Sequence, residues 1–596
     1  MSTAILTGQP VPGSSIEGDL RSLGYDVRVA ADPADAETLL AQVPGDQRVA
    51  LVDARFVGHV HALRLGLTDP RFPLAAIPGA VTAQPAGRQA LTRAMAREHS
   101  AGAGTTLVDS LADRLVTALD ADGTDVHRPE LGSLVAAVPA DPQTRNEARQ
   151  AVAAVDDEAV RLKSAVKSRD GFFTTFFISP YSRYIARWCA RRGLTPNQVT
   201  TASLLTALIA AACAATGTRG GFVAAGVLLI ASFVLDCTDG QLARYSLQYS
   251  TLGAWLDATF DRAKEYAYYA GLALGAARGG DDVWALALGA MILQTCRHVV
   301  DFSFNEANHD ATANTSPTAA LSDKLDSVGW TVWVRRMIVL PIGERWAMIA
   351  VLTAVTTPRI TFYALLIGCA FAATYTTAGR VLRSVTRKAQ RTDRAAQALR
   401  DLTDTGPLAE GLGRVALPLR TPLVAALSAT GAILLTVAFA PYGNRLPALV
   451  AVFYVALSAV AAAARPLKGA LDWLVPPLFR AAEYGTVLIL AAKADVNGAL
   501  PAAFGLVAAV AYHHYDTVYR IRGNAGAPPA WLVRAIGGHE GRTLLVTVLA
   551  AVLSASQFTV ALTALAVAVA LVVLVESIRF WVSAGAPAVH DEGEPA

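Results

Sequence analysis

Long apolar runs fill the chain from about residue 198 onward, whereas residues 1 to about 165 alternate short apolar and polar stretches. Runs of this length and spacing are typical of membrane helices. Twelve runs, two of them short, lie at 198–218, 221–236, 252–277, 283–304, 345–357, 359–382, 421–440, 445–463, 473–492, 498–521, 543–556 and 558–582. The pattern predicts an α-helical integral membrane protein with about twelve transmembrane helices.

The first 165 residues have the pattern of a soluble α/β domain. Strands are predicted at 4–8, 25–31, 48–56 and 72–81. Helices are predicted at 15–23, 35–42 and 88–99. Because strands and helices alternate, we expect three layers built around a parallel sheet.

Residues that carry chemistry are sparse in this domain. A glycine-bearing loop, Leu6–Ser15, could cradle a phosphate, but prolines interrupt it. The first lysine of the chain is Lys163, so the triphosphate-holding lysine expected of a nucleotidyltransferase of this shape is missing. Asp53 is a cap or a metal ligand, and His59 and His61 follow it without a matching acidic partner nearby. We therefore expect a degenerate, nucleotidyltransferase-like domain with a regulatory or vestigial role.

A basic segment leads into the first membrane helix. Within residues 180–193, aromatic and aliphatic residues alternate with Arg183, Arg187, Arg191 and Arg192. This pattern predicts an interfacial helix on an anionic membrane surface, the alternative being a solvated helix packed on the soluble domain. The charge places this side of the membrane inside the cell. With no secretory signal before it, the soluble domain is expected in the cytoplasm and the protein in the plasma membrane.

Composition narrows the function classes. Of the 596 residues, 53% are hydrophobic and 17% are charged, which excludes a disordered chain, a fibrous repeat and an ordinary soluble enzyme. The net charge of +3 gives no support for nucleic-acid binding. The five cysteines include no C-x-x-C pair, which argues against a zinc ribbon and indicates reduced thiols.

Four aspartates interrupt the apolar pattern and carry the strongest chemical signal. Asp236 and Asp239 are three residues apart, and Asp257 and Asp261 are four apart, so each pair lies on one helical face. Carboxylates inside a membrane are costly and indicate function. Four of them would repel one another unless hard cations neutralised them. The alternative is a salt-bridged helix pair, for which only Arg244 and Arg262 are apparent as nearby cations.

This stretch resembles the signature of the CDP-alcohol phosphotransferase (CDP-alcohol phosphatidyltransferase) family, D-x2-D-G-x2-A-R-x8-G-x3-D-x3-D. Asp236, Asp239, Gly240, Ala243, Arg244, Gly253, Asp257 and Asp261 fill every position. The preceding stretch Pro196–Thr200 is similar to the family's P-N-x-V-T entry to its first helix. The resemblance covers residues 175–385 and six membrane helices.

The resemblance implies a transferase in phospholipid biosynthesis that releases CMP when an acceptor hydroxyl attacks a CDP-alcohol. It implies Mg²⁺ or Mn²⁺, two ions in all, on Asp236, Asp239, Asp257 and Asp261, with Asp261 also acting as the catalytic base. The implied nucleotide or substrate contacts are Asn197, Thr200, Gly240, Ala243, Arg244, Ser250 and Gly253. Two metals would clamp the transferring phosphoryl group and stabilise the leaving nucleotide.

The second membrane segment repeats parts of the first. Residues 474–484 match residues 256–266 in arginine, glutamate and tyrosine, but Val475 and Phe479 replace the two aspartates. Further correspondences pair Trp333–Arg336 with Trp531–Arg534, Glu344–Arg345 with Glu540–Arg542, Asp301 with Asp516, and Ala243–Arg244 with Ala464–Arg465. We therefore expect a charged helical connector at 386–409, a degenerate second six-helix domain at 410–585 and a disordered tail at 586–596. The polar residues of that second domain form either a ligand pocket or interhelical pairs.

Several alternatives stay open at this level. The donor is either CDP-diacylglycerol, attacked by a polar alcohol, or a CDP-linked polar head group that a lipid or polyol phosphate accepts. Residues 167–172 are similar to the join between soluble and membrane domains in di-myo-inositol phosphate phosphate synthases, which favours an inositol-phosphate-like partner. The active form is a homodimer or an intramolecular pseudo-dimer. A non-catalytic membrane scaffold that retains a fossil site is the alternative from another class.

Overall fold

The computed structural model describes residues 2–100, 110–167, 170–309, 333, 337–386, 389–414, 422–462, 466–523 and 525–583. The correspondence drawn for Ala464–Arg465, most of Trp333–Arg336 and the predicted tail lie outside these residues. The chain forms two compact units, which are described separately. One comprises Met1–Lys167, Arg183–Pro196 and Gly240–Tyr249, and the other comprises Ser168–Ser182, Asn197–Asp239 and Ser250–Ala596.

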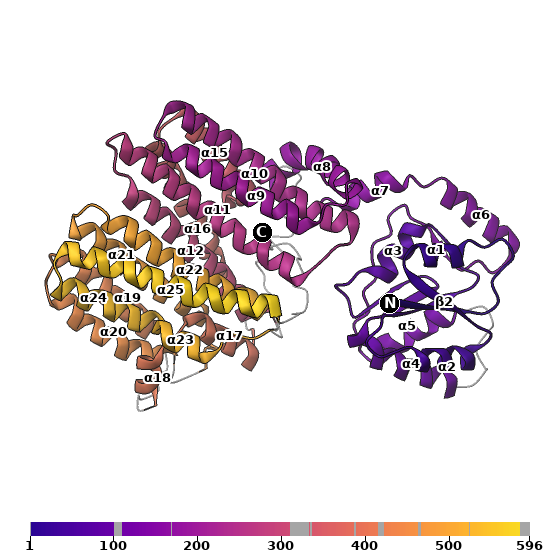
Figure 1. The fold of residues 1–596 in the computed structure, drawn as a ribbon. Helices are drawn as coiled ribbons and strands as arrows, with labels where there is room; N and C mark the ends of the chain where they lie inside the picture. Colours follow the sequence, from indigo (N-terminus) through magenta and orange to yellow (C-terminus); the bar gives the residue numbers. More distant parts are fainter. Residues whose placement is uncertain are drawn as a thin grey trace. The chain divides into compact units, whose positions relative to one another are not determined.

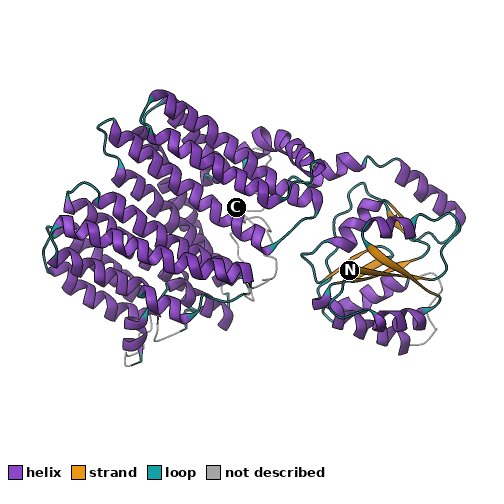
Figure 2. Ribbon diagram, in the orientation of Figure 1, coloured by secondary structure: helices purple, strands orange, loops and turns teal. Residues whose placement is uncertain are grey.

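The N-terminal part of the first unit is built on a five-stranded sheet, the orange arrows of Figure 2. The sheet has the order β2-β1-β3-β6-β5 and consists of β1 (Ser2–Thr7), β2 (Tyr25–Ala30), β3 (Val49–Asp53), β5 (Leu74–Ile77) and β6 (Ala80–Ala83). Strands β1, β2 and β3 are parallel, but β6 is antiparallel to both β3 and β5. The predicted all-parallel sheet is therefore wrong at this edge. The apolar run at 72–81 is a tight hairpin that turns at Gly79, whose φ is 77°.

Helices cover both faces of this sheet, so the predicted three layers are confirmed. One core cluster joins the sheet to α2 (Pro33–Gln42), α4 (Arg88–Ser100) and α5 (Leu111–Ala121). The other joins it to α1 (Ile16–Ser22) and α3 (Val60–Thr68). The alternation along β3 explains this division, because Val49 and Leu51 face the first cluster and Ala50 and Val52 face the second. A short pair, β4 (Val57–Gly58) and β7 (Ala136–Ala137), and the helices α6 (Pro142–Ala153) and α7 (Asp157–Ser164) complete the domain.

The predicted interfacial segment is helix α8 (Ser179–Arg191), which follows a π-helical turn at Thr174–Ile178. Its aromatic side chains are exposed, with Tyr181 at 70% and Trp188 at 52%. On its other side, Arg187 and Arg191 bind Glu158 of α7 at 2.9 and 3.0 Å. The helix thus shows features of both interpretations, since some arginines are paired to the soluble domain while the aromatic residues stay exposed.

A helix lies over every one of the twelve predicted apolar runs (Figure 1). The first six are α9 (Pro196–Ala215), α10 (Arg219–Ser246), α11 (Thr251–Arg278), α12 (Trp284–Asn308), α15 (Ile342–Val355) and α16 (Pro358–Thr386). The last six are α19 (Pro422–Phe439), α20 (Leu446–Ala462), α21 (Val475–Ala494), α22 (Ala499–Arg522), α24 (Gly538–Val552) and α25 (Ala555–Ser583). Between the two sets lie α17 (Asp393–Thr403) and α18 (Pro407–Gly413), and α23 (Ala530–Ile536) precedes α24.

Six helices in the described part of the chain are long and apolar enough to cross a membrane, and together they indicate a membrane protein. They are α9, α10, α16, α19, α21 with the turn before it, and α25. The predicted count of twelve is not confirmed. Helices α15 and α24 have 14 and 15 residues, which at about 1.5 Å per residue is less than the roughly 30 Å of a bilayer core.

Small residues set the close packing that positions the acidic site. A Cβ on Gly271 or Gly275 of α11 would lie 2.4 or 2.0 Å from the carbonyl oxygens of Ala211 and Ala214 in α9. Glycine at these positions therefore lets the two helix backbones touch, as small residues do in membrane helix pairs. This contact fixes α11, which carries two of the four aspartates.

Candidate metal and phosphoryl-transfer site

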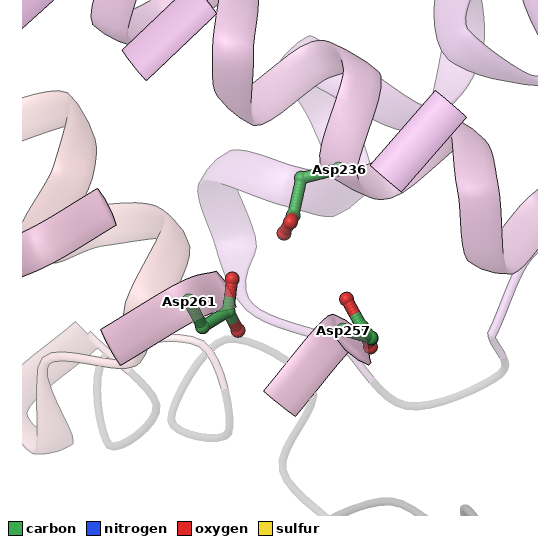
Figure 3. A group of neighbouring side chains, drawn as sticks. All are labelled: Asp236, Asp257 and Asp261. Carbon is green, nitrogen blue, oxygen red and sulfur yellow. The ribbon is translucent and has the colours of Figure 1, made fainter. Parts of the chain in front are cut away.

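Three of the four aspartates converge. Asp236 extends from α10, and Asp257 and Asp261 extend from successive turns at the start of α11. Each offers a carboxylate oxygen, and these oxygens all lie within 4.8 Å of one another. Figure 3 shows the three side chains directed into the same space from two helices. The structure therefore brings three of the four signature aspartates together from two helices.

The fourth aspartate, Asp239, is held separately. It lies about one turn beyond Asp236 on α10, and its Oδ2 accepts a 2.6 Å hydrogen bond from the Thr200 hydroxyl of α9. Both side chains are buried, at 4% and 3% exposed. Thr200 is thus joined directly to the acidic motif by a hydrogen bond, and the contact with a nucleotide that the resemblance implies for it stays a prediction.

A lysine that the sequence analysis missed lies among the acids. Lys264 is fully buried one turn after Asp261, and its Nζ forms ion pairs with Asp236 and, at 2.9 Å, with Asp261. The same ammonium donates to Ser203 Oγ at 3.2 Å and lies 5.4 Å from the centre of the Trp346 ring. The i, i+3 spacing from Asp261 to Lys264 was the available signal.

The expectation that Arg244 and Arg262 are the only cations near the aspartates is therefore wrong. Arg262 pairs with a glutamate instead of with the signature aspartates. Arg262 binds Glu265 at 3.1 Å, and Glu265 in turn binds Arg345 of α15 at 3.2 Å. Glu265 and Arg345 are each 2% exposed. Arg262 consequently belongs to an arginine–glutamate–arginine triad beside the aspartates, of which Glu265 and Arg345 are buried.

Three of the predicted contact residues, Asn197, Ser250 and Gly253, lie together at the start of α11. Ser250 caps the helix, its Oγ accepting from the Gly253 N–H at 2.9 Å. A Cβ on Gly253 would lie 2.6 Å from Asn197 Oδ1 and 2.8 Å from Ser250 Oγ. Ser250 and Gly253 therefore have an evident structural function, which is to let the entry of α9 and the start of α11 approach each other.

The remaining motif residues follow on α10. The nearest atoms that a Cβ on Gly240 would meet belong to the flexible Arg244 guanidinium, at 3.4 Å or more, so close packing does not require glycine there. Ala243 is half-buried beside it. The Arg244 Nε donates to the carbonyl oxygen of Ala165 at 2.6 Å. One edge of this guanidinium is therefore anchored to the backbone that follows α7.

The carboxylate group fits a divalent cation. Carboxylate oxygens are the ligands that Mg²⁺ and Mn²⁺ prefer, and three of them converge from two rigid helices. Lys264 supplies one positive charge on the side of Asp236 and Asp261, which leaves Asp257 as the acid with the fewest compensating contacts. The arrangement can thus hold a cation and present charged oxygens to a phosphate-bearing substrate.

Two candidate residues of the N-terminal domain, Asp53 and His59, are engaged in local contacts. Asp53 binds Arg55 at 2.8 Å and caps the turn after β3. The His59 ring, which caps α3, has an acidic neighbour, since its Nδ1 lies 3.8 Å from Asp157 of α7. The expectation that His59 lacks an acidic partner is therefore wrong, because the partner comes from a helix almost one hundred residues later in the chain.

The polar residues of the C-terminal segment are largely ion-paired. Arg480 binds Asp404 at 3.3 Å and Glu483 at 2.7 Å, and Arg542 binds the same two acids at 2.6 and 2.5 Å. The His513 ring lies 3.2 Å from Asp404. Of the two interpretations of this cluster, the contacts favour interhelical pairing, with Asp404 of the connector as the acid that the sequence analysis did not include.

Two family models match the chain. The model described as CDP-alcohol phosphatidyltransferase matches residues 193–374. The model described as a family of unknown function (DUF5941) matches residues 393–596. The four aspartates, Thr200 and Lys264 all fall within the first match.

Three curated relatives are each similar to about a fifth of the chain. The phosphatidylinositol phosphate synthase of Streptomyces avermitilis is 34% identical over 131 residues, 21% of this chain and 51% of that protein. The archaetidylinositol phosphate synthase of Pyrococcus horikoshii is 31% identical over 113 residues, 19% of this chain and 58% of that protein. The bifunctional IPC transferase and DIPP synthase of Aquifex aeolicus is 32% identical over 114 residues, 19% of this chain and 26% of that protein. The matches thus span from about a quarter to somewhat more than half of these relatives.

Proposed function

Residues 193–374 are a domain of the CDP-alcohol phosphatidyltransferase family, and on that premise we propose that the chain transfers a phosphatidyl-type group from a CDP-activated lipid to an acceptor hydroxyl. The observation that carries the proposal is the convergence of Asp236, Asp257 and Asp261. These acids occupy signature positions and lie together although two helices supply them. The products would be a phosphodiester and CMP.

The chain's own residues have distinct parts in this reaction. Asp236, Asp257 and Asp261 would hold a divalent cation, with Asp239 beside them on α10. When bound, such an ion neutralises charge on the phosphoryl oxygens and on the departing nucleotide. Arg244, anchored through its Nε, would direct its remaining N–H groups at a nucleotide phosphate.

Asp261 is the proposed base. The acceptor oxygen forms a bond to the lipid-bearing phosphorus while the bond from that phosphorus to the oxygen of CMP breaks. The proton of the acceptor hydroxyl passes to an oxygen of Asp261. Lys264, 2.9 Å from Asp261, orients this carboxylate and limits its rotation.

For the acceptor we propose a phosphorylated polyol of the inositol phosphate type. The names of the relatives from Streptomyces avermitilis and Pyrococcus horikoshii support this choice, since both are inositol phosphate lipid synthases.

We propose that the acidic site lies at the cytoplasmic face of the plasma membrane, because the arginines of α8 precede the first candidate span.

A second candidate is a membrane protein that binds nucleotide or lipid without turnover. The specific observation in its favour is Lys264, whose ammonium already pairs with two of the four aspartates. In this candidate, a cation supplied by the chain itself stabilises the cluster with no metal bound.

Incubation of the purified full chain with CDP-diacylglycerol and inositol phosphate, followed by assay of CMP, tests the proposal. We expect CMP release that depends on Mg²⁺ or Mn²⁺ and stops in excess chelator. Asp261→Asn should lower turnover by about 10²- to 10⁴-fold, the usual contribution of a general base, while nucleotide binding persists. Asp236→Ala should lower both. Turnover in excess chelator would rule out the metal-dependent reaction, and nucleotide binding without CMP release from any acceptor would favour the second candidate.

A further inference from the structure

The helices of the C-terminal block follow the same order as those of the catalytic block, and the last three helices of each block also match in length. The catalytic block is defined here as α9–α12 with α15 and α16, and the C-terminal block as α19–α22 with α24 and α25. The fourth helices, α12 and α22, have 25 and 24 residues. The fifth, α15 and α24, have 14 and 15, and the sixth, α16 and α25, have 29 each.

Both blocks contain the same arginine–glutamate–arginine triad. In the catalytic block, Arg262 and Glu265 on the third helix meet Arg345 near the start of the fifth helix, at 3.1 and 3.2 Å. In the C-terminal block, Arg480 and Glu483 on the third helix meet Arg542 near the start of the fifth, at 2.7 and 2.5 Å. Two arginines that share one glutamate from equivalent helices form a specific arrangement, because each buried charge needs its partners in place.

A second polar contact is repeated between the fourth and sixth helices. Asp301 of α12 binds Arg380 of α16. Asp516 of α22 accepts from Ser577 of α25 at 2.8 Å. The two aspartates stand at the same position counted from the start of their helices, and so do Arg380 and Ser577. Side chains have changed while the contact between the two helix positions has remained.

The catalytic positions, by contrast, are filled with apolar groups. Counting back from the shared arginine, Val475 and Phe479 replace Asp257 and Asp261. Phe479 is fully buried and stacks on the His539 ring, with centroids 4.3 Å apart. Helix α20, the counterpart of α10, has no acidic residue in its described length. A metal ion has no carboxylate ligands at these positions.

The two blocks also meet in a reciprocal way. The fourth helix of the catalytic block, α12, packs against the third helix of the C-terminal block, α21. Likewise, the fourth helix of the C-terminal block, α22, packs against the third helix of the catalytic block, α11. The equivalent helices α12 and α22 contact each other directly. Such an exchange of contacts is the property of an interface between two subunits related by a two-fold axis. Figure 1 shows the two sets of helices side by side.

We propose that the C-terminal block is a degenerate copy of the catalytic block and acts as its permanent, built-in partner subunit. It covers the α11–α12 face and supports the helix that carries Asp257 and Asp261. The support reaches the site through Tyr515 of α22, whose hydroxyl is 2.7 Å from His298 Nδ1 and whose ring lies 5.3 Å from the Arg262 guanidinium carbon. Arg262 is the residue next to Asp261.

The number of chains per particle is the first test. Native mass spectrometry or light scattering of the full chain in lipid nanodiscs should give one copy, because the face that a second copy would use is already covered. A particle with two copies crosslinked through α11 and α12 would overturn the proposal. This readout does not depend on catalysis, so it stays informative even if no acceptor is turned over.

A matched pair of variants tests the support of the site. Tyr515→Phe and Tyr454→Phe each remove one buried hydroxyl that binds a histidine at 2.7 Å, His298 across the interface and His539 within the C-terminal block. We expect Tyr515→Phe to weaken Mn²⁺ binding and to slow CMP release about threefold to tenfold, the cost of one buried hydrogen bond. Tyr454→Phe should leave both at wild-type values. Equal effects of the two variants, or no effect of Tyr515→Phe, would overturn the supporting role.

Discussion

At the scale of single residues, the negative charge of the aspartates in the site is partly neutralised by one buried lysine. Asp236, Asp257 and Asp261 converge, and Lys264 neutralises part of their charge from a fully buried position. A buried lysine that pairs with two carboxylates orients them, but its charge also opposes a metal ion at the same oxygens. We therefore expect the affinity of this site for a divalent cation to depend on a residue outside the aspartate signature.

Removal of the charge of Lys264 should tighten metal binding. We expect Lys264→Met to increase Mn²⁺ affinity by about tenfold or more, equivalent to ~1.4 kcal/mol per tenfold, because one repelling charge is lost. Turnover should fall at the same time, since Asp261 loses its orienting partner. Electron paramagnetic resonance titration of Mn²⁺ measures the affinity, with Lys264→Arg as the control that keeps the charge. Weaker Mn²⁺ binding in Lys264→Met would mean that the lysine organises the metal ligands instead of competing with the ion.

A histidine in the N-terminal domain gives a pH-dependent prediction. His61 is 3% exposed and neither ring nitrogen has a hydrogen-bond partner in the described structure. Burial, partly opposed by Asp157, lowers the pKa of His61 from 6.5 to about 4. The unfolded state therefore binds the proton first, so stability is complete above pH 6.5 and declines as the pH falls toward 4, by up to about 3 kcal/mol.

Hydrogen exchange of the full chain measures this loss. Amides of α3 should lose protection between pH 6.5 and 4, after correction for intrinsic rates, and His61→Leu should remove most of the loss. Equal pH dependence in the two proteins would show that another group is responsible.

At the scale of elements, the start of α11 decides whether the acids meet. Ser250 caps the helix, Gly253 admits Asn197 from the start of α9, and two glycines further along α11 let the same two helices touch. These contacts help to hold α11 in the position where its two acids lie within 4.8 Å of Asp236. Two glycines of the signature therefore have different physical roles, since Gly253 is required by packing and Gly240 is not.

A pair of glycine-to-alanine variants separates these roles. Gly253→Ala should lower both melting temperature and CMP release, because its Cβ would lie 2.6 Å from Asn197 Oδ1. Gly240→Ala should keep or raise the melting temperature, since alanine is favoured over glycine in a helix by about 1 kcal/mol. It should still slow CMP release if the nucleotide approaches the backbone there. Thermal denaturation and the CMP assay on the same preparations distinguish the cases, and a stable, fully active Gly253→Ala protein would contradict the packing argument.

At the scale of the whole molecule, two compact units and three segments with different expected roles share one chain. The N-terminal domain has a complete α/β fold, yet its loop from β1 to α1 lacks a lysine and contains prolines. The central segment has the signature acids, and the C-terminal segment has their apolar replacements. We expect catalysis only in the central segment.

The full chain should therefore use a preformed CDP-alcohol and make none. Incubation with CTP and a sugar or polyol phosphate should release no pyrophosphate, while the same preparation releases CMP from CDP-diacylglycerol. The second reaction is the internal control for an active preparation. Pyrophosphate release above that of a chain without residues 1–165 would assign synthesis of the donor to the N-terminal domain.

Much of this architecture follows from the sequence alone. The apolar runs determine the twelve helix positions, and the spacing of Asp236, Asp239, Asp257 and Asp261 indicates two acidic helix faces, because both signals are local and periodic. The arginine and glutamate shared by residues 256–266 and 474–484 likewise point to a repeat.

Other features depend on residues brought together from distant parts of the chain. The antiparallel edge of the sheet depends on a hairpin inside one apolar run, and the contact of His59 with Asp157 joins two separate helices. Lys264 reaches Asp236 only after α10 and α11 pack, and Asp404 joins Arg480 and Arg542 from the connector. Sequence periodicity reports the faces of single helices, whereas the partner of a buried charge is chosen by packing between elements, so only the tertiary structure decides which charges meet.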